Sequence, residues 1–257
     1  EDLKEEYVGK PYFVTNTDSK VGIIAIHGFS SAPLEVKDMA TYLSQHNFNV
    51  YAPRLKGHGT IPLDLQDSSW KQWYNSLSRA ITIASMKYEK FYIAGFSAGG
   101  LLALLSSKKN CSKMKALICI NAALNLKDIR VKALVPAVNL WNEIVSNVNE
   151  DLQKEFVDND AEYPEINYNK HFVKSIFQLN ALMNTTKKSL PKIKHPTLII
   201  QGEHDPVVNP NSAREIFSGI KSKNKKIVML DFKNHVIIKG ERKELIFKEI
   251  IQFIKDN

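Results

Sequence analysis

The chain has 257 residues, of which 44% are hydrophobic and 24% are charged, and it carries a formal net charge of +8 at neutral pH. These fractions are typical of a globular protein and exclude a disordered chain, and no apolar run reaches the ~18 residues of a membrane-spanning helix. Only five of the 35 basic residues are arginine, the residue best suited to phosphate and base recognition, and they are scattered, which argues against a nucleic-acid partner.

Short, nearly continuous apolar runs alternate with segments of helical periodicity along the chain. Strands that are covered on both faces lose the alternation of apolar and polar residues. The pattern therefore predicts the α/β class, with a mostly parallel sheet between two layers of helices. In chain order, we predict strands at 21–26, 91–96, 116–120, 197–200 and 227–230, and helices at 34–46, 70–86, 98–107 and 241–254.

The stretch from residue 125 to 195 interrupts this alternation. It contains no β-like run, and its apolar residues recur at helical separations. Loops of this length without structure of their own are rare in compact domains, so we predict a helical lid inserted over the sheet. The predicted domains are a core of residues 1–124 and 196–257 and a lid of residues 125–195. An extra packing layer without a gating role is the alternative.

The segment Phe91–Gly100 has the pattern of a strand, then Gly-x-Ser-x-Gly, then a helix. A serine on such a sharp strand-to-helix turn adopts a strained backbone, and the glycines on either side leave room for that turn. The turn pushes the hydroxyl of Ser97 outward to where a substrate can meet it. We therefore predict that Ser97 is a nucleophile, with the N-cap of a helix as the alternative role.

A serine hydroxyl needs a neighbouring base and an orienting carboxylate to act as a nucleophile at neutral pH. His235 follows the last predicted strand and Asp205 follows the strand before it, so both should lie at the same carboxyl edge of the sheet as Ser97. We predict that His235 is the general base and acid and that Asp205 orients it. Glu203 and Asp231 are rival acids, and a loop histidine without a catalytic role is the alternative for His235.

The tetrahedral intermediate of acyl transfer carries negative charge on an oxygen that needs fixed hydrogen-bond donors. The backbone N–H of Ala98, at a helix N-terminus directly after the nucleophile, is one predicted donor of this oxyanion hole. The N–H of Phe29 is the second, in the turn that His27 and Gly28 form after an early strand. We interpret His27 as a buried structural histidine, because the imidazole for the chemistry is already assigned.

Five segments together resemble the α/β-hydrolase superfamily, and the order Ser97, Asp205, His235 is that of its catalytic residues. Within it, the chain is similar to small bacterial carboxylesterases and monoacylglycerol lipases that carry a compact lid after the sixth strand of an eight-stranded sheet. The resemblance extends over nearly the whole chain from about Tyr12. The segments are Ile26–Phe29, Pro53–Thr60, Gly95–Gly100, Ile120–Leu124 and Gly202–Val207.

The resemblance implies hydrolysis of small-molecule carboxylic esters with apolar acyl chains through an acyl-enzyme, without a cofactor or a metal ion. The acyl or alcohol group would occupy an apolar pocket under the lid. Residues on the site loops and on the lid would form its walls, although each could also serve packing alone. These residues are Phe29, Leu124, Leu134, Val138, Ile176, Leu179 and Val207.

Other functions stay open at this stage. An acyl thioesterase would use the same residues. A serine aminopeptidase would need a carboxylate for the substrate ammonium group, and only Glu143, Glu162 and Glu165 of the predicted lid are local candidates, without a paired acidic motif. A ligand receptor with this fold would lack turnover, although every part of the catalytic machinery is present in the sequence.

The remaining features of the sequence bear on its surroundings. Cys111 and Cys119 fit neither a disulfide framework nor a metal motif, so we expect two free thiols. The lysine-rich segment 221–226 is typical of a solvated loop, although weak contact with an anionic membrane surface stays open. The chain begins at Glu1 rather than Met; we expect a cytoplasmic protein and leave open a signal or anchor before that residue. The sequence contains no sign of the oligomeric state.

Overall fold

The computed structural model describes residues 2–109, 111–127 and 156–257. Seven strands of this part of the chain form one sheet with the order β1-β3-β2-β4-β5-β8-β9. Strand β1 runs antiparallel to β3, and all other neighbouring pairs are parallel, as the continuous apolar runs predicted. The strands are β1 (Tyr12–Val14), β2 (Val21–Ile26), β3 (Asn49–Ala52), β4 (Lys90–Phe96), β5 (Met114–Ile120), β8 (Thr197–Gly202) and β9 (Lys225–Leu230).

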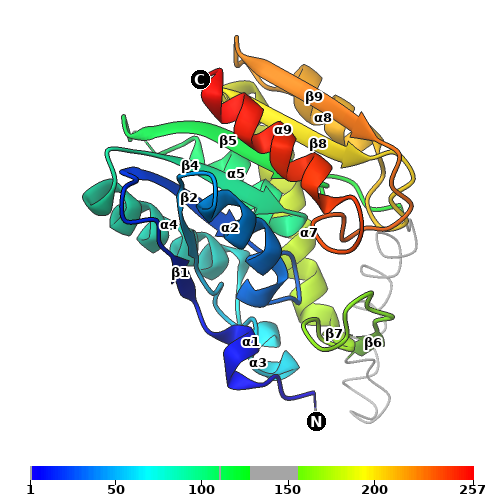
Figure 1. Cartoon of the computed structure of the whole chain (residues 1–257). Coiled ribbons are helices and arrows are strands. Elements are labelled where there is room, and N and C mark those ends of the chain that lie inside the picture. The colour runs from blue at the N-terminus through cyan, green and yellow to red at the C-terminus, as the bar shows by residue number, and fades with distance from the viewer. Residues whose placement is uncertain (1, 110, 128–155) are drawn as a thin grey trace, which may run out of the picture.

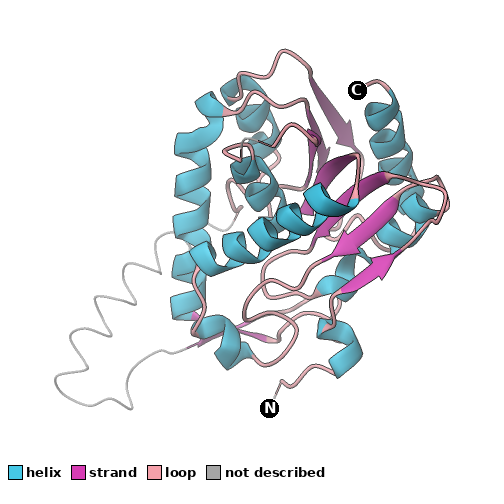
Figure 2. Cartoon of the chain, turned by 90° about the vertical axis from the view of Figure 1, so that its left-hand side faces the viewer, coloured by secondary structure: helices cyan, strands magenta, loops and turns pink. Residues whose placement is uncertain are grey.

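Helices cover both faces of this sheet, as Figure 1 and Figure 2 show. On one face, α2 and α9 enclose Met39 and Phe247 in the core. On the other face, α4, α5 and α8 pack, and Trp73 and Leu101 are buried. The helices are α1 (Glu6–Gly9), α2 (Lys37–Ser44), α3 (Pro62–Gln66), α4 (Trp70–Lys87), α5 (Ala98–Ser106), α7 (Val173–Ser189), α8 (Asn211–Gly219) and α9 (Lys243–Lys255), with short 3-10 turns η1 (Pro33–Val36) and η3 (Leu190–Lys192).

The predicted strands and helices of the core are present, with ends that differ by a few residues. Helix α4 begins at a capping box, in which Ser69 and Gln72 each accept a hydrogen bond from the backbone N–H of the other. Strands β1 and β3 and helices α1, α3 and α8 are not among the predicted elements. Strands β1 and β3 are too short to form a clear apolar run, and α8 buries only Ser212, Ala213 and Ile216, which is too few apolar residues for a helical pattern.

The segment between β5 and β8, which we predicted to be a helical lid, contains a hairpin as well as a long helix. Strand β6 (Phe156–Asp158) pairs antiparallel with β7 (Lys170–Phe172), so the prediction that this segment has no strand was wrong. Both strands have three residues and none of these is buried, and strands of this kind leave no apolar run to recognise. Helix α7 follows and packs against α5 through buried residues such as Leu182.

Cys111 and Cys119 are free thiols, as predicted. Cys119 lies in β5 with no exposed surface, and this burial raises the pKa of its thiol because a thiolate there would lose its hydration. In the part of the chain that the structure describes, none of the helices combines the length and the apolar character that crossing a bilayer requires.

Candidate active site

Ser97 occupies the turn between β4 and α5, where its backbone φ is 53°. Few residues other than glycine adopt this left-handed region, so the turn is strained, as the Gly-x-Ser-x-Gly pattern predicted. A Cβ atom on Gly95 would lie 2.1 Å from the carbonyl oxygen of Gly99, and one on Gly99 would lie 2.5 Å from that of Ile26. The close backbone approach therefore requires both glycines. The Ser97 side chain makes no capping hydrogen bond to α5.

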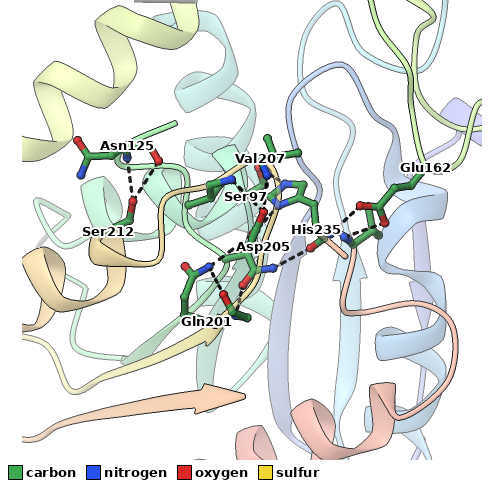
Figure 3. A network of polar contacts seen from close by, with 12 residues as sticks. Ser97, Asn125, Glu162, Gln201, Asp205, Val207, Ser212 and His235 are labelled. Carbon is green, nitrogen blue, oxygen red and sulfur yellow. Dashed lines mark hydrogen bonds and ion pairs between the residues drawn. The ribbon is translucent and has the colours of Figure 1, made fainter. Parts of the chain in front are cut away.

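Three parallel strands bring Ser97, His235 and Asp205 together at one edge of the sheet (Figure 3). Ser97 follows β4, Asp205 lies in the loop after β8, and His235 lies in the loop after β9. The Nε2 atom of His235 is 3.1 Å from the Oγ atom of Ser97, and its Nδ1 atom is 2.8 Å from Oδ2 of Asp205. An ionised carboxylate only accepts hydrogen bonds, so Nδ1 carries the proton and Nε2 is free to accept the serine hydroxyl.

Asp205 is fully buried, and its loop holds it in place. Its Oδ1 atom accepts the backbone N–H groups of Val207 and Val208 at 2.8 and 2.9 Å, so that Oδ2 faces the imidazole. The two rival acids lie elsewhere. Glu203 is exposed, and the exposed Asp231 carboxylate lies 3.5 Å from His204 rather than beside His235.

His27 lies fully buried beneath the turn that carries Phe29. Its Nε2 atom accepts the N–H of Leu55 at 3.3 Å, which leaves Nδ1 to donate to the carbonyl oxygen of Gly28 at 2.9 Å. Burial lowers the pKa of His27 to about 4, so the ring stays neutral and keeps this tautomer near neutral pH. Because the peptide group is planar and trans, the N–H of Phe29 points away from the side that His27 holds. This N–H donates no hydrogen bond within the described residues.

Glu35, a buried carboxyl group in the wall of the site, did not emerge from the sequence. Only 2% of its surface is exposed, and its Oε2 atom accepts the N–H of Gly28 at 2.7 Å. Burial raises the pKa of Glu35, although the N–H of Gly28, the hydroxyl of Ser31 and the positive charge of Lys239 act in the opposite direction. Glutamate in the first turn of a helix is usually a solvated residue, so its position in η1 gave no signal.

A cavity of about 700 Å³ opens above Ser97 and His235. Of the residues predicted to line a pocket, the cavity contacts Phe29, Ile176, Leu179 and Val207, whereas Leu134 and Val138 lie outside the described residues. The prediction for Leu124 was wrong: its side chain is fully buried in the core cluster between the sheet and the helices, and Ala123 lines the cavity in its place.

The buried His58, which lies beside the buried His27, and the half-buried His171 lie close to the ring of Phe29. His58 and His171 have their rings 6.3 and 5.1 Å from that ring, and His27 lies 5.1 Å from His58. Burial lowers the pKa of all three, to about 4 for His27 and His171, so they are neutral side chains near neutral pH. In the ranges that the structure describes, no group of three or more His, Cys, Asp and Glu side chains is arranged to hold a metal ion.

Two side chains outside the Ser97, Asp205 and His235 group contact the backbone of His235, and Figure 3 shows the one from Glu162. Glu162 accepts the N–H of His235 at 2.6 Å, and Asn121 donates to the carbonyl oxygen of His235 at 2.7 Å. From the sequence, Glu162 is only a candidate partner for a substrate ammonium group, and Asn121 is only part of the segment Ile120–Leu124. Neither contact could be read from the sequence, because each joins parts of the chain that are far apart.

Comparisons with known proteins identify a family and several relatives of this chain. The family described as serine aminopeptidase, S33, matches residues 17–243. A thermostable monoacylglycerol lipase of Bacillus sp. (strain H-257) is 28% identical over 247 residues, which cover 95% of this chain and 93% of that protein. A carboxylesterase of Bacillus subtilis (strain 168) is 20% identical over 247 residues, or 96% of each chain. A solved structure from work on two metagenome-derived lipolytic enzymes, LipS and LipT, has a TM-score of 0.84 and 25% identity and covers 97% of this chain and 98% of its own.

Proposed function

The chain belongs to the serine aminopeptidase S33 family and has the α/β-hydrolase fold, and from this premise we propose that it is a serine hydrolase of carboxylic esters with apolar acyl chains. The observation that carries the proposal is the line of contacts from Ser97 Oγ through His235 to Asp205, at 3.1 and 2.8 Å. A hydroxyl, a neutral imidazole acceptor and a buried carboxylate in this order form the arrangement that activates a serine for acyl transfer.

In the first half of the reaction, Ser97 Oγ attacks the ester carbonyl carbon while its proton moves to Nε2 of His235. Asp205 stabilises the imidazolium that results, because its Oδ2 atom already accepts the Nδ1 proton. The imidazolium then gives the proton to the alcohol oxygen, the bond from carbon to that oxygen breaks, and the alcohol leaves. The acyl group stays on Ser97 as an ester.

In the second half, a water molecule takes the place of the alcohol. His235 accepts a proton from the water while the water oxygen attacks the acyl carbon. His235 then gives that proton to Ser97 Oγ as the bond between the acyl carbon and Oγ breaks. The carboxylic acid leaves and Ser97 regains its hydroxyl. Both halves pass through a tetrahedral intermediate with negative charge on the former carbonyl oxygen.

The backbone N–H groups of Phe29 and Ala98 act as the donors to this oxygen. Ala98 is the first residue of α5, and the first N–H groups of a helix have no partner within it. For Phe29, the contact of His27 with the Gly28 carbonyl turns the N–H away from the buried side of the turn. Donors that are fixed before the reaction stabilise the intermediate without rearranging during it.

The volume and the lining of the cavity support an apolar acyl group. Phe29, Ile176, Leu179 and Val207 supply apolar contacts within a volume of about 700 Å³, which is in the range of pockets for small organic ligands. Residues 125–195 act as the lid in this proposal, with α7 contributing Ile176 and Leu179 to the wall. Two relatives are named as a monoacylglycerol lipase and a carboxylesterase, which supports an ester as the substrate.

An aminopeptidase, the activity in the name of the family, is a weaker candidate. It would need a carboxylate free to bind the substrate ammonium group. Both oxygens of Glu162 already accept backbone N–H groups of His235 and Val236, which occupies one of the three carboxylates that the sequence offered for that task. A thioesterase shares every contact described for the ester reaction, so the substrate assay must include a thioester.

Two measurements test the proposal. The first is covalent labelling of the protein with a fluorophosphonate, which reacts with activated serines; we expect labelling in the parent and none in Ser97→Ala. The second is hydrolysis of p-nitrophenyl esters, monoacylglycerols and an acyl thioester of increasing chain length, with an aminoacyl p-nitroanilide for the peptidase. Ester turnover that persists in Ser97→Ala, or preferred cleavage of the anilide, would contradict it.

A further inference from the structure

The carboxylate of Glu162 contacts the backbone of the catalytic loop, the stretch between β9 and α9 that carries His235, with both of its oxygens (Figure 3). Its Oε1 atom accepts the N–H of His235 at 2.6 Å, and its Oε2 atom accepts the N–H of Val236 at 3.1 Å. Glu162 lies in the connection between β6 and β7, more than seventy residues before His235 in the chain. Hydrogen bonds in which the acceptor is ionised are shorter and stronger than neutral ones, so this contact restrains the loop more than a neutral side chain would.

The carbonyl side of the His235 backbone is also held by a side chain. The Nδ2 atom of Asn121 donates to the carbonyl oxygen of His235 at 2.7 Å, and its Oδ1 atom accepts the N–H of Gly202 at 2.8 Å. Asn121 is fully buried just after the end of β5, so this contact joins His235 to the core of the sheet. The backbone of His235 is thus held on its carbonyl side by the core and on its N–H side by Glu162.

These contacts determine how far the imidazole can reach. The stretch from Asp231 to Glu241 between β9 and α9 contains no helix or strand, so no regular hydrogen-bond pattern places His235. The imidazole must nevertheless meet Ser97 at 3.1 Å and Asp205 at 2.8 Å at the same time. A displacement of about 1 Å in a reacting group can cost about 100-fold in rate, so the restraint on the backbone bears directly on catalysis.

We propose that Glu162 is a positioning residue for His235, which holds the backbone N–H groups of the catalytic loop so that the imidazole stays within reach of Ser97. This inference rests on the proposed function. It assigns to the segment between β5 and β8 a part in the chemistry itself, in addition to forming a wall of the cavity. Glu162 touches no reacting atom and acts only through His235.

The test compares Glu162→Gln and Glu162→Ala with the parent and with Glu165→Gln. Glutamine keeps one acceptor oxygen and alanine keeps none, so we expect kcat to fall about tenfold in Glu162→Gln and further in Glu162→Ala. Glu165→Gln removes the same charge three residues away, at a side chain that neither lines the cavity nor contacts the His235 loop in the described chain, and it should keep the parent kcat. Glu162 is exposed, so Tm should change by only a few degrees.

The pattern of the loss separates positioning from other roles. A residue that acts through His235 should lower kcat by the same factor for p-nitrophenyl acetate, p-nitrophenyl butyrate and monobutyrin, with KM within about twofold of the parent. A loss confined to KM, or to the glycerol ester alone, would place Glu162 on the substrate and overturn the proposal. An unchanged kcat in both Glu162 variants would overturn it as well.

Fluorophosphonate labelling keeps this test independent of the choice of ester. The rate of labelling of Ser97 reports the activation of the hydroxyl by His235, and we expect it to fall about tenfold in Glu162→Gln whether or not the right ester has been found. Equal labelling rates in the parent and in both variants would overturn the role of Glu162 alone. A parent that labels but hydrolyses no ester would instead contradict the proposed substrate class and leave the labelling rates to decide on Glu162.

Discussion

The imidazole Nε2 of His235 lies 3.1 Å from the hydroxyl oxygen of Ser97, across a separation of 138 residues in the chain. Two strands that lie apart in the sheet, β4 and β9, end at the same edge and deliver these side chains to one point. The ring of Phe96 lies 5.0 Å from the imidazole and limits its movement. Substitutions of the side chains around this contact distinguish those that serve catalysis from those that serve stability.

Asp205→Asn should lower kcat by about 10³ to 10⁴-fold. The N–H groups of Val207 and Val208 require an acceptor, so the amide oxygen of the substituted side chain would face them and its NH2 group would face His235. The imidazole would then carry its proton on Nε2 instead of Nδ1, and Nε2 could no longer accept the proton of Ser97. Steady-state hydrolysis of a p-nitrophenyl ester measures the loss.

The matched control for that change is Asp231→Asn, at the rival acid that the sequence offered. Asp231 is exposed and lies beside His204, so this variant should keep the parent kcat. The reverse result, with Asp231→Asn inactive and Asp205→Asn active, would show that the acid had been assigned to the wrong loop.

Glu35→Gln should reduce the decrease in the free energy of unfolding that occurs as the pH rises. Burial raises the pKa of Glu35 above its ordinary value of 4.5. Between pH 4.5 and this raised pKa, the folded protein holds a proton that the unfolded chain has released. Stability therefore falls as the pH rises through this window. Glutamine has no proton to release and keeps an oxygen for the N–H of Gly28.

Urea unfolding at pH 5 and pH 8 checks this prediction. We expect the free energy of unfolding of the parent to decrease more between the two values than that of Glu35→Gln, and the variant to be at least as stable as the parent at pH 8. If the parent instead gained stability relative to the variant between pH 5 and pH 8, the folded protein would favour the ionised form of Glu35, and the prediction would be contradicted.

His27 should make the protein less stable in acid. Burial lowers its pKa from 6.5 to about 4, so between these values the unfolded chain binds a proton that the folded protein does not. Stability then falls as the pH drops, by about 2 kcal/mol between pH 7.5 and pH 5 from this group. Glutamine can accept from Leu55 and donate to Gly28 without binding a proton, so His27→Gln should lose less stability over the same interval in urea unfolding. Equal losses in the two proteins would contradict this assignment.

Gly95→Ala should be strongly destabilising, by more than about 3 kcal/mol, or should prevent folding. Its Cβ atom would lie 2.1 Å from a backbone oxygen of Gly99, which cannot move without distorting the turn at Ser97. Gly202→Ala is the matched control, because its Cβ atom would first meet Phe232 at 3.4 Å, an ordinary contact distance. Thermal unfolding of both variants compares them, and similar Tm values would refute the packing argument.

The sequence supported the fold class and the position of the nucleophile because both depend on local patterns. Strands β2, β4, β5 and β8 are buried along nearly their whole length and appear as apolar runs, and Gly-x-Ser-x-Gly describes one tight turn. The edge strand β1 and the exposed hairpin of β6 and β7 bury too little to leave such a pattern. The placement of His235 and Asp205 at one edge followed from the rule that parallel strands end on the same side.

By itself, the sequence determined which side chains are available for chemistry, their order along the chain, and the parallel sheet that gathers them. Only the tertiary structure decided which carboxylate faces the imidazole, which way the peptide before Phe29 is turned, and that Glu35 and Glu162 belong to the site. The physical reason is that a hydrogen bond depends on the position and direction of two groups within a few tenths of an ångström. Spacing in the sequence limits where a strand ends, but the packing of distant segments sets those last distances.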